Sequence, residues 1–118
     1  MASYKSLLVW KKAHELFLDV SQVTRAFPPD ERFALTDQLR RAALSVPANI
    51  VEGQAFGSTP VFLRHLAIAC GSLAETRYLL QVAYELQYLP PEQYATAEGL
   101  AEETSRLLTR LRQSLQRS

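Results

Sequence analysis

The sequence predicts an all-α fold, an antiparallel up-down-up-down four-helix bundle that forms a single domain over residues 1–118. Apolar residues recur at alternating steps of three and four along most of the chain, which is the spacing of one helix face. The few prolines and glycines fall mainly between these apolar segments. Nothing reads as a strand, and short connections between long helices place neighbours antiparallel.

The first helix is expected from Leu7 to Phe27, where two prolines end it. Its apolar face consists of Val9, Ala13, Leu16, Val20, Val23 and Phe27. For the second helix, Asp30 and Glu31 supply an N-terminal cap and a first-turn acid. Its apolar face consists of Leu35, Leu39, Ala42, Val46 and Ile50, and Gly53 and Gly57 bracket its end.

The third helix is expected to start with Thr59 as a cap and Pro60 in the first helical position, and to end at Pro90 and Pro91. Its apolar face consists of Phe62, Leu66, Ala69, Leu73, Leu80 and Ala83, and is widened by Ile68, Leu79, Val82 and Leu86. This face is wider than one neighbouring helix requires. The fourth helix runs from Pro91 to about Leu115. Its apolar face consists of Tyr94, Ala97, Ala101, Thr104, Leu108, Leu111 and Leu115, and Leu100 and Leu107 lie beside it.

Pro47 interrupts the second helix. A proline inside a helix removes one hydrogen bond and presses on the carbonyl four residues earlier, at a cost of roughly 3 kcal/mol or more. Two local structures fit: a continuous helix kinked at Pro47, or a stop near Ser45 with a restart at Pro47. We favour the kink, because Val46 is a poor cap, whereas Ser45 and Asn49 can bond back to carbonyls freed at the bend.

Composition points to a soluble, cytoplasmic protein without membrane association. Thirteen Lys and Arg against twelve Asp and Glu leave a formal net charge of +1, which predicts neither nucleic acid nor an acidic partner. The single cysteine, Cys70, lies in an apolar run and cannot form an intrachain disulfide. The N-terminal apolar run, Leu7 to Trp10, is too short for a signal peptide or a membrane span.

Three strings carry a family resemblance: LLVWKKAHEL, ALTDQLRRAALSVPANIVEG and FLRHLAIACGSLAETRYLL. From about Leu8 to Leu111, the chain resembles the four helix bundle proteins whose founding members are encoded in intervening sequences of bacterial 23S ribosomal RNA genes. A more distant branch comprises the accessory variability determinant proteins of diversity-generating retroelements. The matching positions are Trp10, Ala13, Leu35, Gln38, Arg41, Ala42, Ser45, Pro47, Asn49, Glu52, Gly53, Phe62, Gly71, Ser72 and Glu75.

The resemblance implies a homo-pentamer of four-helix protomers arranged in a ring. In the retroelement branch, the basic surface of the pentamer binds nucleic acid and docks a reverse transcriptase. The wide apolar face of the third helix agrees with assembly, because a monomeric bundle should not expose such a surface. Gly71 and Ser72, like Ala67 and Ala69, are expected to allow close helix approach.

Two sets of polar residues are candidate sites. The assembly set consists of Gln38, Arg40, Arg41, Ser45, Pro47, Asn49, Glu52 and Glu75. Within it, Arg40 and Arg41 with Glu52 and Glu75 are expected to form a buried cluster that fixes register or, less favoured, binds a ligand. The nucleic-acid set consists of Arg106, Arg110, Arg112 and Arg117, extended by Lys5, Lys11 and Lys12 if the first and fourth helices share a face. The favoured alternative is that these arginines complement a helix dipole and solubilise its surface.

We expect no catalytic activity, no bound metal and no cofactor. A di-metal bundle needs Glu-x-x-His on two helices, but Lys11 and Phe62 stand three residues before His14 and His65. No Gly-rich phosphate loop exists, and Cys70 has no partner at metal-ligand spacing. Two hypotheses remain: a non-enzymatic, homo-oligomeric interaction module, and an RNA- or DNA-binding accessory factor that is ribosome-related or the partner of a retroelement reverse transcriptase.

Overall fold

Four long helices make up most of the computed structural model, which describes residues 4–117. They are α1 (Leu8–Val23), α2 (Asp37–Ala55), α3 (Thr59–Glu85) and α4 (Pro91–Gln116). Single 3₁₀ turns lie at Tyr4–Ser6, Thr24–Ala26 and Pro29–Glu31, and a π-helical turn spans Arg32–Thr36. No strand occurs between residues 4 and 117. The prediction of an all-α four-helix bundle is confirmed.

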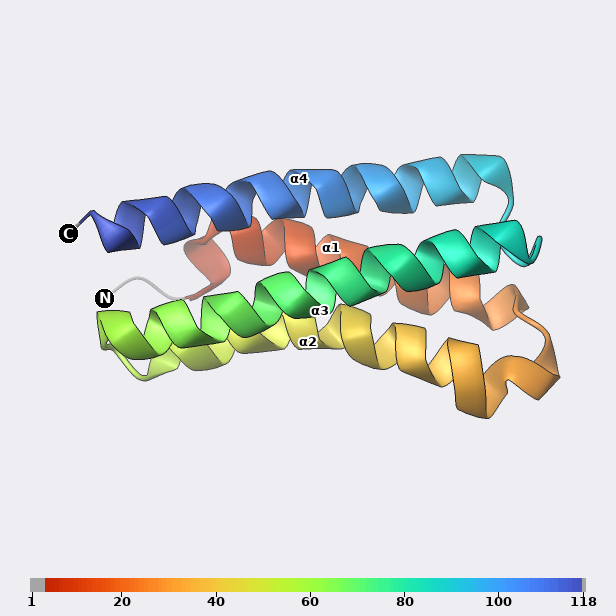
Figure 1. Ribbon diagram of the computed structural model, residues 1–118, viewed down its shortest axis with the longest axis horizontal. Coiled ribbons are helices and arrows are strands. Elements are labelled where there is room, and N and C mark those ends of the chain that lie inside the picture. The colour runs from red at the N-terminus through yellow and green to blue at the C-terminus, as the bar shows by residue number, and fades with distance from the viewer. Residues whose placement is uncertain (1–3, 118) are drawn as a thin grey trace.

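Successive helices run in opposite directions along an elongated bundle of 46 × 24 × 20 Å (Figure 1). α1 packs against α2 and α4, and α3 packs against the same two helices. α1 and α3 therefore lie diagonally across the bundle, with α3 in front and α1 behind in this view. One end holds the start of α1, the α2–α3 turn and the end of α4, and the other end holds the α1–α2 and α3–α4 connections.

The core forms from the apolar faces expected from the sequence. It includes Val9, Ala13, Leu16, Val20, Val23, Phe27, Leu39, Ala43, Val46, Ile50, Leu66, Ala69, Leu73, Leu80, Ala83, Ala97, Ala101 and Leu108. Two details differ from the expectation: Ala43 joins this cluster whereas the expected Ala42 is buried outside it, and Phe27 lies after the 3₁₀ turn that follows α1 and not on a helix. Leu35, Phe62, Tyr94, Leu111 and Leu115 are partly buried against them. Each fully buried Leu or Ile contributes roughly 1.5–3 kcal/mol, so burial of these faces supplies most of the stability of the fold.

The start of the second helix differs from the expectation. Asp30 lies in the 3₁₀ turn and caps no helix, and α2 begins only at Asp37, after the π-helical turn. Glu31 is engaged elsewhere, because its carboxylate accepts a 2.9 Å hydrogen bond from the Tyr88 hydroxyl. This bond raises the pKa of Tyr88 and ties the α1–α2 connection to the segment after α3.

Both ends of α3 are displaced from the expected positions. Ser58, not Thr59, is the cap: its hydroxyl accepts a 3.4 Å hydrogen bond from the Val61 amide, and Thr59 is already helical. The helix ends at Glu85, before the Pro90–Pro91 pair. Gln87 then adopts the left-handed conformation with φ of 66°, which a non-glycine residue rarely does and which the sequence does not signal.

α2 continues through Pro47 without a break, so the alternative of a stop near Ser45 and a restart at Pro47 is wrong. Pro47 is buried inside the continuous helix. The kink remains a prediction. Asn49 Nδ2 donates to the Ser45 carbonyl at 2.9 Å, which is not the expected bond to a freed carbonyl, because the carbonyl that Pro47 frees is that of Ala43.

Gly53 sets how closely α2 approaches α3. A Cβ atom at this position would stand 2.8 Å from His65 Cβ and 2.9 Å from Phe62 Cδ1. Neither distance is tolerable without movement, and His65 Cβ is fixed to the α3 backbone. Only glycine therefore fits at this crossing, because the distance between two helix axes depends on the side chains at the contact.

We predict that Gly53→Ala destabilises the protein. Overpacking costs about 1–3 kcal/mol, which outweighs the roughly 1 kcal/mol gained from alanine's higher helix propensity. Gly99→Ala is the matched control, because Gly99 is exposed on α4 and an added Cβ would meet no atom within 4 Å. Urea unfolding should show Gly99→Ala stabilised by roughly 0.5–1 kcal/mol. Equal stabilisation of both variants would contradict the close approach at Gly53.

Candidate interaction surfaces

A row of polar side chains joins α2 to α3, and we call it the α2–α3 polar seam. Gln38 Nε2 donates to Glu75 Oε2 near the start of α2. Further along, the Ser45 and Ser72 hydroxyl oxygens lie 2.8 Å apart. Such contacts between directional groups fix the register of two helices, because a shift along either axis breaks both pairs.

Asn49 extends the seam to His65 on α3. Its Oδ1 lies 2.9 Å from His65 Nδ1, while its Nδ2 is committed to the Ser45 carbonyl and hydroxyl. Because Asn49 Oδ1 can only accept, this arrangement assigns the proton of the neutral imidazole to Nδ1. The Glu52 carboxylate lies 3.7 Å from the same nitrogen. His65, which sequence reasoning considered only as a metal ligand, is therefore a central member of the seam.

The expected buried cluster of Arg40 and Arg41 with Glu52 and Glu75 does not form. Arg40 Nε donates to Thr24 Oγ1 at 2.8 Å, next to the end of α1. Arg41 is exposed and pairs with Asp37 of its own helix at 3.2 Å. Each residue in a helix turns about 100° from the last, so Arg40, five residues before Ser45, points away from the seam. Arg41, four residues before Ser45, lies on the same side as the seam but is exposed and reaches Asp37 instead.

The start of α1 and the end of α4 lie at the same end of the bundle, and the two helices are in contact, so they share a face as expected (Figure 1). Acidic residues offset part of the basic set there. Lys12 Nζ lies 3.5 Å from Glu15 and 3.6 Å from Glu103. Arg106 lies 3.9 Å from Glu102 on its own helix. Lys12 and Arg106 are therefore already paired with carboxylates.

The other members of the basic set divide into two groups. Arg112 turns toward α3, where its Nη1 lies 3.5 Å from the Cys70 sulfur, and it does not join the α1 side. Lys11, Arg110 and Arg117 are exposed and form no ion pair within residues 4–117. Lys5 is also exposed, in the turn before α1.

Arg77 links α3 to α4, a role that the sequence did not reveal. Its Nε donates to Glu98 Oε1 at 2.9 Å, and its Nη2 reaches both Glu98 and, at 3.2 Å, Glu102. The Glu98 hydrogen bond is the main reason that the pKa of Arg77 is raised. Finding this group from sequence requires the register between α3 and α4, which apolar spacing does not give.

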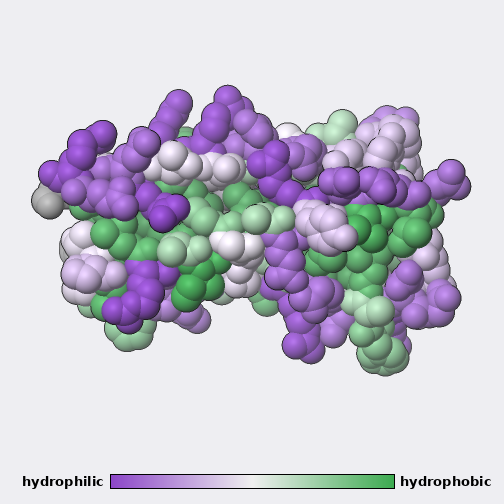
Figure 2. Space-filling model, in the orientation of Figure 1, coloured by the Kyte–Doolittle hydropathy of each residue, from purple (hydrophilic) through white to green (hydrophobic). Residues whose placement is uncertain are grey.

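Large exposed apolar residues lie on α1, α2 and α3 and in the segments that flank α2, where Phe33 and Phe56 are the most exposed. Ile68 and Tyr78 on α3 are 48% and 62% exposed, and Leu8 and Leu18 on α1 are 54% and 51% exposed. Figure 2 shows apolar surface in two areas of the face on which α3 lies, with hydrophilic side chains between them and along the edges. Because α1 and α3 are diagonal in the bundle, their outward faces point to opposite sides.

Gly71 lies on the outward side of α3 and does not bring helices together within the protomer. A Cβ added to Gly71 would meet nothing within 4 Å, which contradicts the expected role in close approach. Ala67 and Ala74 are exposed beside it, at helical steps of four and three. We call Ala67, Ile68, Gly71, Ala74 and Tyr78 the α3 stripe.

The part of the chain that the structure describes contains no group of three or more His, Cys, Asp or Glu side chains placed to hold a metal ion. None of its helices is long and apolar enough to cross a membrane.

We predict that Asn49→Ala lowers the free energy of unfolding by about 1–3 kcal/mol, because it leaves His65 Nδ1 without its hydrogen-bond acceptor and removes one of the two partners of the Ser45 hydroxyl. Arg41→Ala is the control: its exposed pair within one helix contributes about 0.3–0.5 kcal/mol. Urea unfolding measures both. A larger loss for Arg41→Ala would restore the buried arginine cluster and argue against the seam.

Comparison with known proteins agrees with this architecture. A solved structure of a protein of unknown function from the S23 ribosomal protein family of Bacteroides thetaiotaomicron is similar, with a TM-score of 0.81 and 26% sequence identity. The similarity covers 88% of this chain and 97% of the other. No curated protein matches the sequence. The model of the 23S rRNA-intervening sequence protein family matches residues 5–110, which confirms the resemblance: this chain belongs to that family.

Proposed function

We propose that the protein is a non-enzymatic interaction module that assembles with copies of itself into a ring, which the family resemblance implies is a pentamer. The observation that carries this proposal is the presence of exposed apolar residues on two opposite sides, on α1 and on α3. Single exposed leucines are ordinary on a protein surface. The α3 stripe differs, because it places Ile68 and Tyr78 around small residues that let another helix approach closely.

Two different surfaces on opposite sides favour a ring over a two-fold dimer. A two-fold dimer buries the same patch of both copies, whereas a closed ring joins one patch of each protomer to a different patch of the next. The α3 stripe of one copy against Leu8 and Leu18 of the next is the pairing that these positions support. A protomer in such a ring hides both apolar surfaces from water, which stabilises the assembly.

We predict that the native protein elutes as five protomers in size-exclusion chromatography with light scattering, and that Gly71→Glu breaks this assembly. Gly99→Glu is a closely matched control, because both glycines are exposed on helices and have open space around them. Leu18→Glu should also break the assembly through the opposite patch. A native monomer, or equal effects of Gly71→Glu and Gly99→Glu, would contradict the proposal.

Mixing variants separates a ring from a two-fold dimer. The Gly71→Glu chain retains Leu8 and Leu18 on α1, and the Leu18→Glu chain retains its α3 stripe, so an equimolar mixture should form a heterodimer that neither variant forms alone. A dimer through α3 alone would leave the Leu18→Glu variant fully assembled. That result would replace the ring with a two-fold arrangement.

Nucleic-acid binding is the second candidate function, and the unpaired cations Lys11, Arg110 and Arg117 favour it. Lys11 lies in the first turn of α1, Arg110 in the last two turns of α4 and Arg117 directly after α4, at one end of the bundle. Cations that already face carboxylates, such as Lys12 and Arg106, are less available to phosphates. RNA or DNA, alone or with a reverse transcriptase, is the partner that the resemblance implies for such a surface.

We predict that a triple Lys11→Gln, Arg110→Gln and Arg117→Gln variant loses most of its affinity for a short structured RNA. Each lost phosphate contact lowers the slope of log affinity against log salt concentration by about 0.7–0.9, so three contacts lower it by roughly two to three. A double Lys12→Gln and Arg106→Gln variant is the control and should change the slope little. An unchanged slope in the triple variant would remove this candidate.

A further inference from the structure

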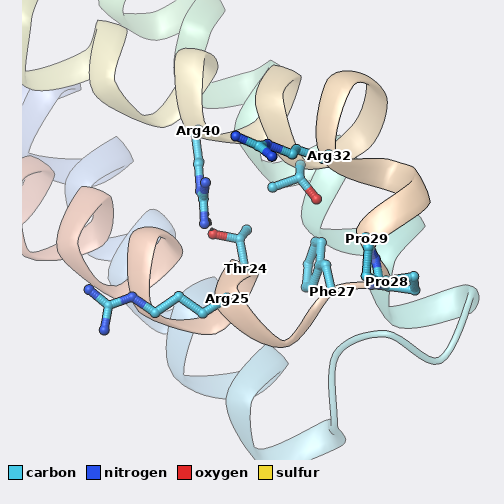
Figure 3. A pocket seen from close by; sticks show the side chains of 8 residues that line it. Thr24, Arg25, Phe27, Pro28, Pro29, Arg32 and Arg40 are labelled. Carbon is cyan, nitrogen blue, oxygen red and sulfur yellow. Dashed lines mark hydrogen bonds between the residues drawn. The ribbon is translucent and has the colours of Figure 1, made fainter.

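A cavity of about 370 Å³ opens where α1 ends and the chain folds back toward α2 (Figure 3). Three arginines contribute to its lining, Arg25, Arg32 and Arg40, and no lining residue is acidic. Its volume is within the range of small-molecule sites. The charged residues that line this cavity are all positive, whereas at the other end of the bundle basic side chains such as Lys12 and Arg106 face carboxylates.

Arg40 is held in place with part of its guanidinium unused. Its Nε donates to Thr24 Oγ1 at 2.8 Å, and the Thr24 hydroxyl donates in turn to the Val20 carbonyl at 2.7 Å. In the described chain, the terminal nitrogens of Arg40 make no further hydrogen bond, and no carboxylate pairs with it. A half-buried guanidinium without a counter-ion is costly, and an anion in the cavity would remove that cost.

The neighbouring arginines are also without carboxylate partners among residues 4–117. Arg32 lies over the exposed ring of Phe33, with Cζ 5.2 Å from the ring centroid. In Figure 3 the guanidinium of Arg32 points toward Arg40, whereas the guanidinium of Arg25 extends away from both. Of the acids in this region, Glu31 accepts from Tyr88 and Asp37 pairs with Arg41, whereas Asp30 is exposed and does not line the cavity.

Thr36 adds a second unsatisfied group to the lining. Its side chain is buried, and its Oγ1 makes no hydrogen bond within the described residues. An unsatisfied buried hydroxyl costs about 1–3 kcal/mol, so such groups are uncommon and call for an explanation. A ligand that completes the polar lining of the cavity provides one.

We propose that this cavity binds the phosphate monoester group of a small molecule. A phosphate dianion presents three acceptor oxygens in different directions, which suits several guanidiniums, whereas a carboxylate presents two in one plane. The buried Phe27 and the adjacent Pro28 give the cavity an apolar wall that can cover the organic part of such a ligand. The site lies within one protomer and does not depend on assembly.

The test is calorimetric titration at constant ionic strength with inorganic phosphate and phenyl phosphate, against succinate as the carboxylate probe. Phosphate and phenyl phosphate should bind, with succinate at least about tenfold weaker. Arg40→Gln and Arg32→Gln should each weaken phosphate binding about tenfold, and Arg25→Gln about twofold to threefold. Arg64→Gln, which removes an exposed arginine of α3 outside the cavity, should bind as the native protein does.

Thr36→Val separates a binding role from a structural one. Without ligand, this variant should melt at or above the native temperature, because it removes a hydroxyl that has no partner. Its phosphate affinity should nevertheless fall severalfold. The proposal is overturned if phosphate does not bind, if succinate binds as tightly, or if Arg64→Gln weakens binding as much as Arg40→Gln. It is equally overturned if only RNA binds and Arg40→Gln leaves that binding unchanged.

Discussion

The close approach of α2 to α3 at Gly53 is the constraint on which the remaining structure depends. With no side chain at this point, the two helices come near enough for Ser45 to reach Ser72 and for Asn49 to reach His65. A larger distance would break both contacts, because hydrogen bonds weaken steeply beyond about 3.2 Å. The polar seam then fixes both the position of α3 along α2 and the rotation of α3 about its own axis. This rotation decides which α3 residues point outward.

The seam also explains why a proline is tolerated in the middle of α2. Pro47 leaves the Ala43 carbonyl without its usual backbone donor, and the bonds of Asn49 to the Ser45 carbonyl and hydroxyl do not replace it. These bonds and the contact of Asn49 with His65 hold the turn around Pro47 against α3. Tertiary contacts on both sides of Pro47 therefore keep the helix continuous, where local propensity alone would favour a break. Most of the residues that carry the family resemblance, including Gln38, Ser45, Asn49 and Gly53, lie in or beside this seam.

The apolar helix faces were predictable because burial follows a period that is visible in sequence. Leu16, Ile50, Leu80 and Leu108 are all buried as expected. The polar partners were not predictable, because a pair across two helices depends on the register between the helices and on the rotation of each about its axis. The spacing of apolar residues gives neither of these. Thus Arg40 was expected beside Glu52 but bonds Thr24, and Arg77, which joins α3 to α4, was missed altogether.

The proposed surfaces occupy different parts of the molecule, and this decides whether they can act together. The α3 stripe and the exposed leucines of α1 lie along opposite sides of the bundle, whereas the arginine-lined cavity lies at the end where α1 connects to α2. A ring closed through the sides would leave the ends of each protomer at its two rims. Every copy would then present its cavity on one rim and Lys11, Arg110 and Arg117 on the other. Because Leu8 lines one groove with Arg110, assembly through the sides would cover part of the basic end, whereas the arginine-lined cavity would be repeated around one rim without being covered, so that one ring could engage several anionic groups at once.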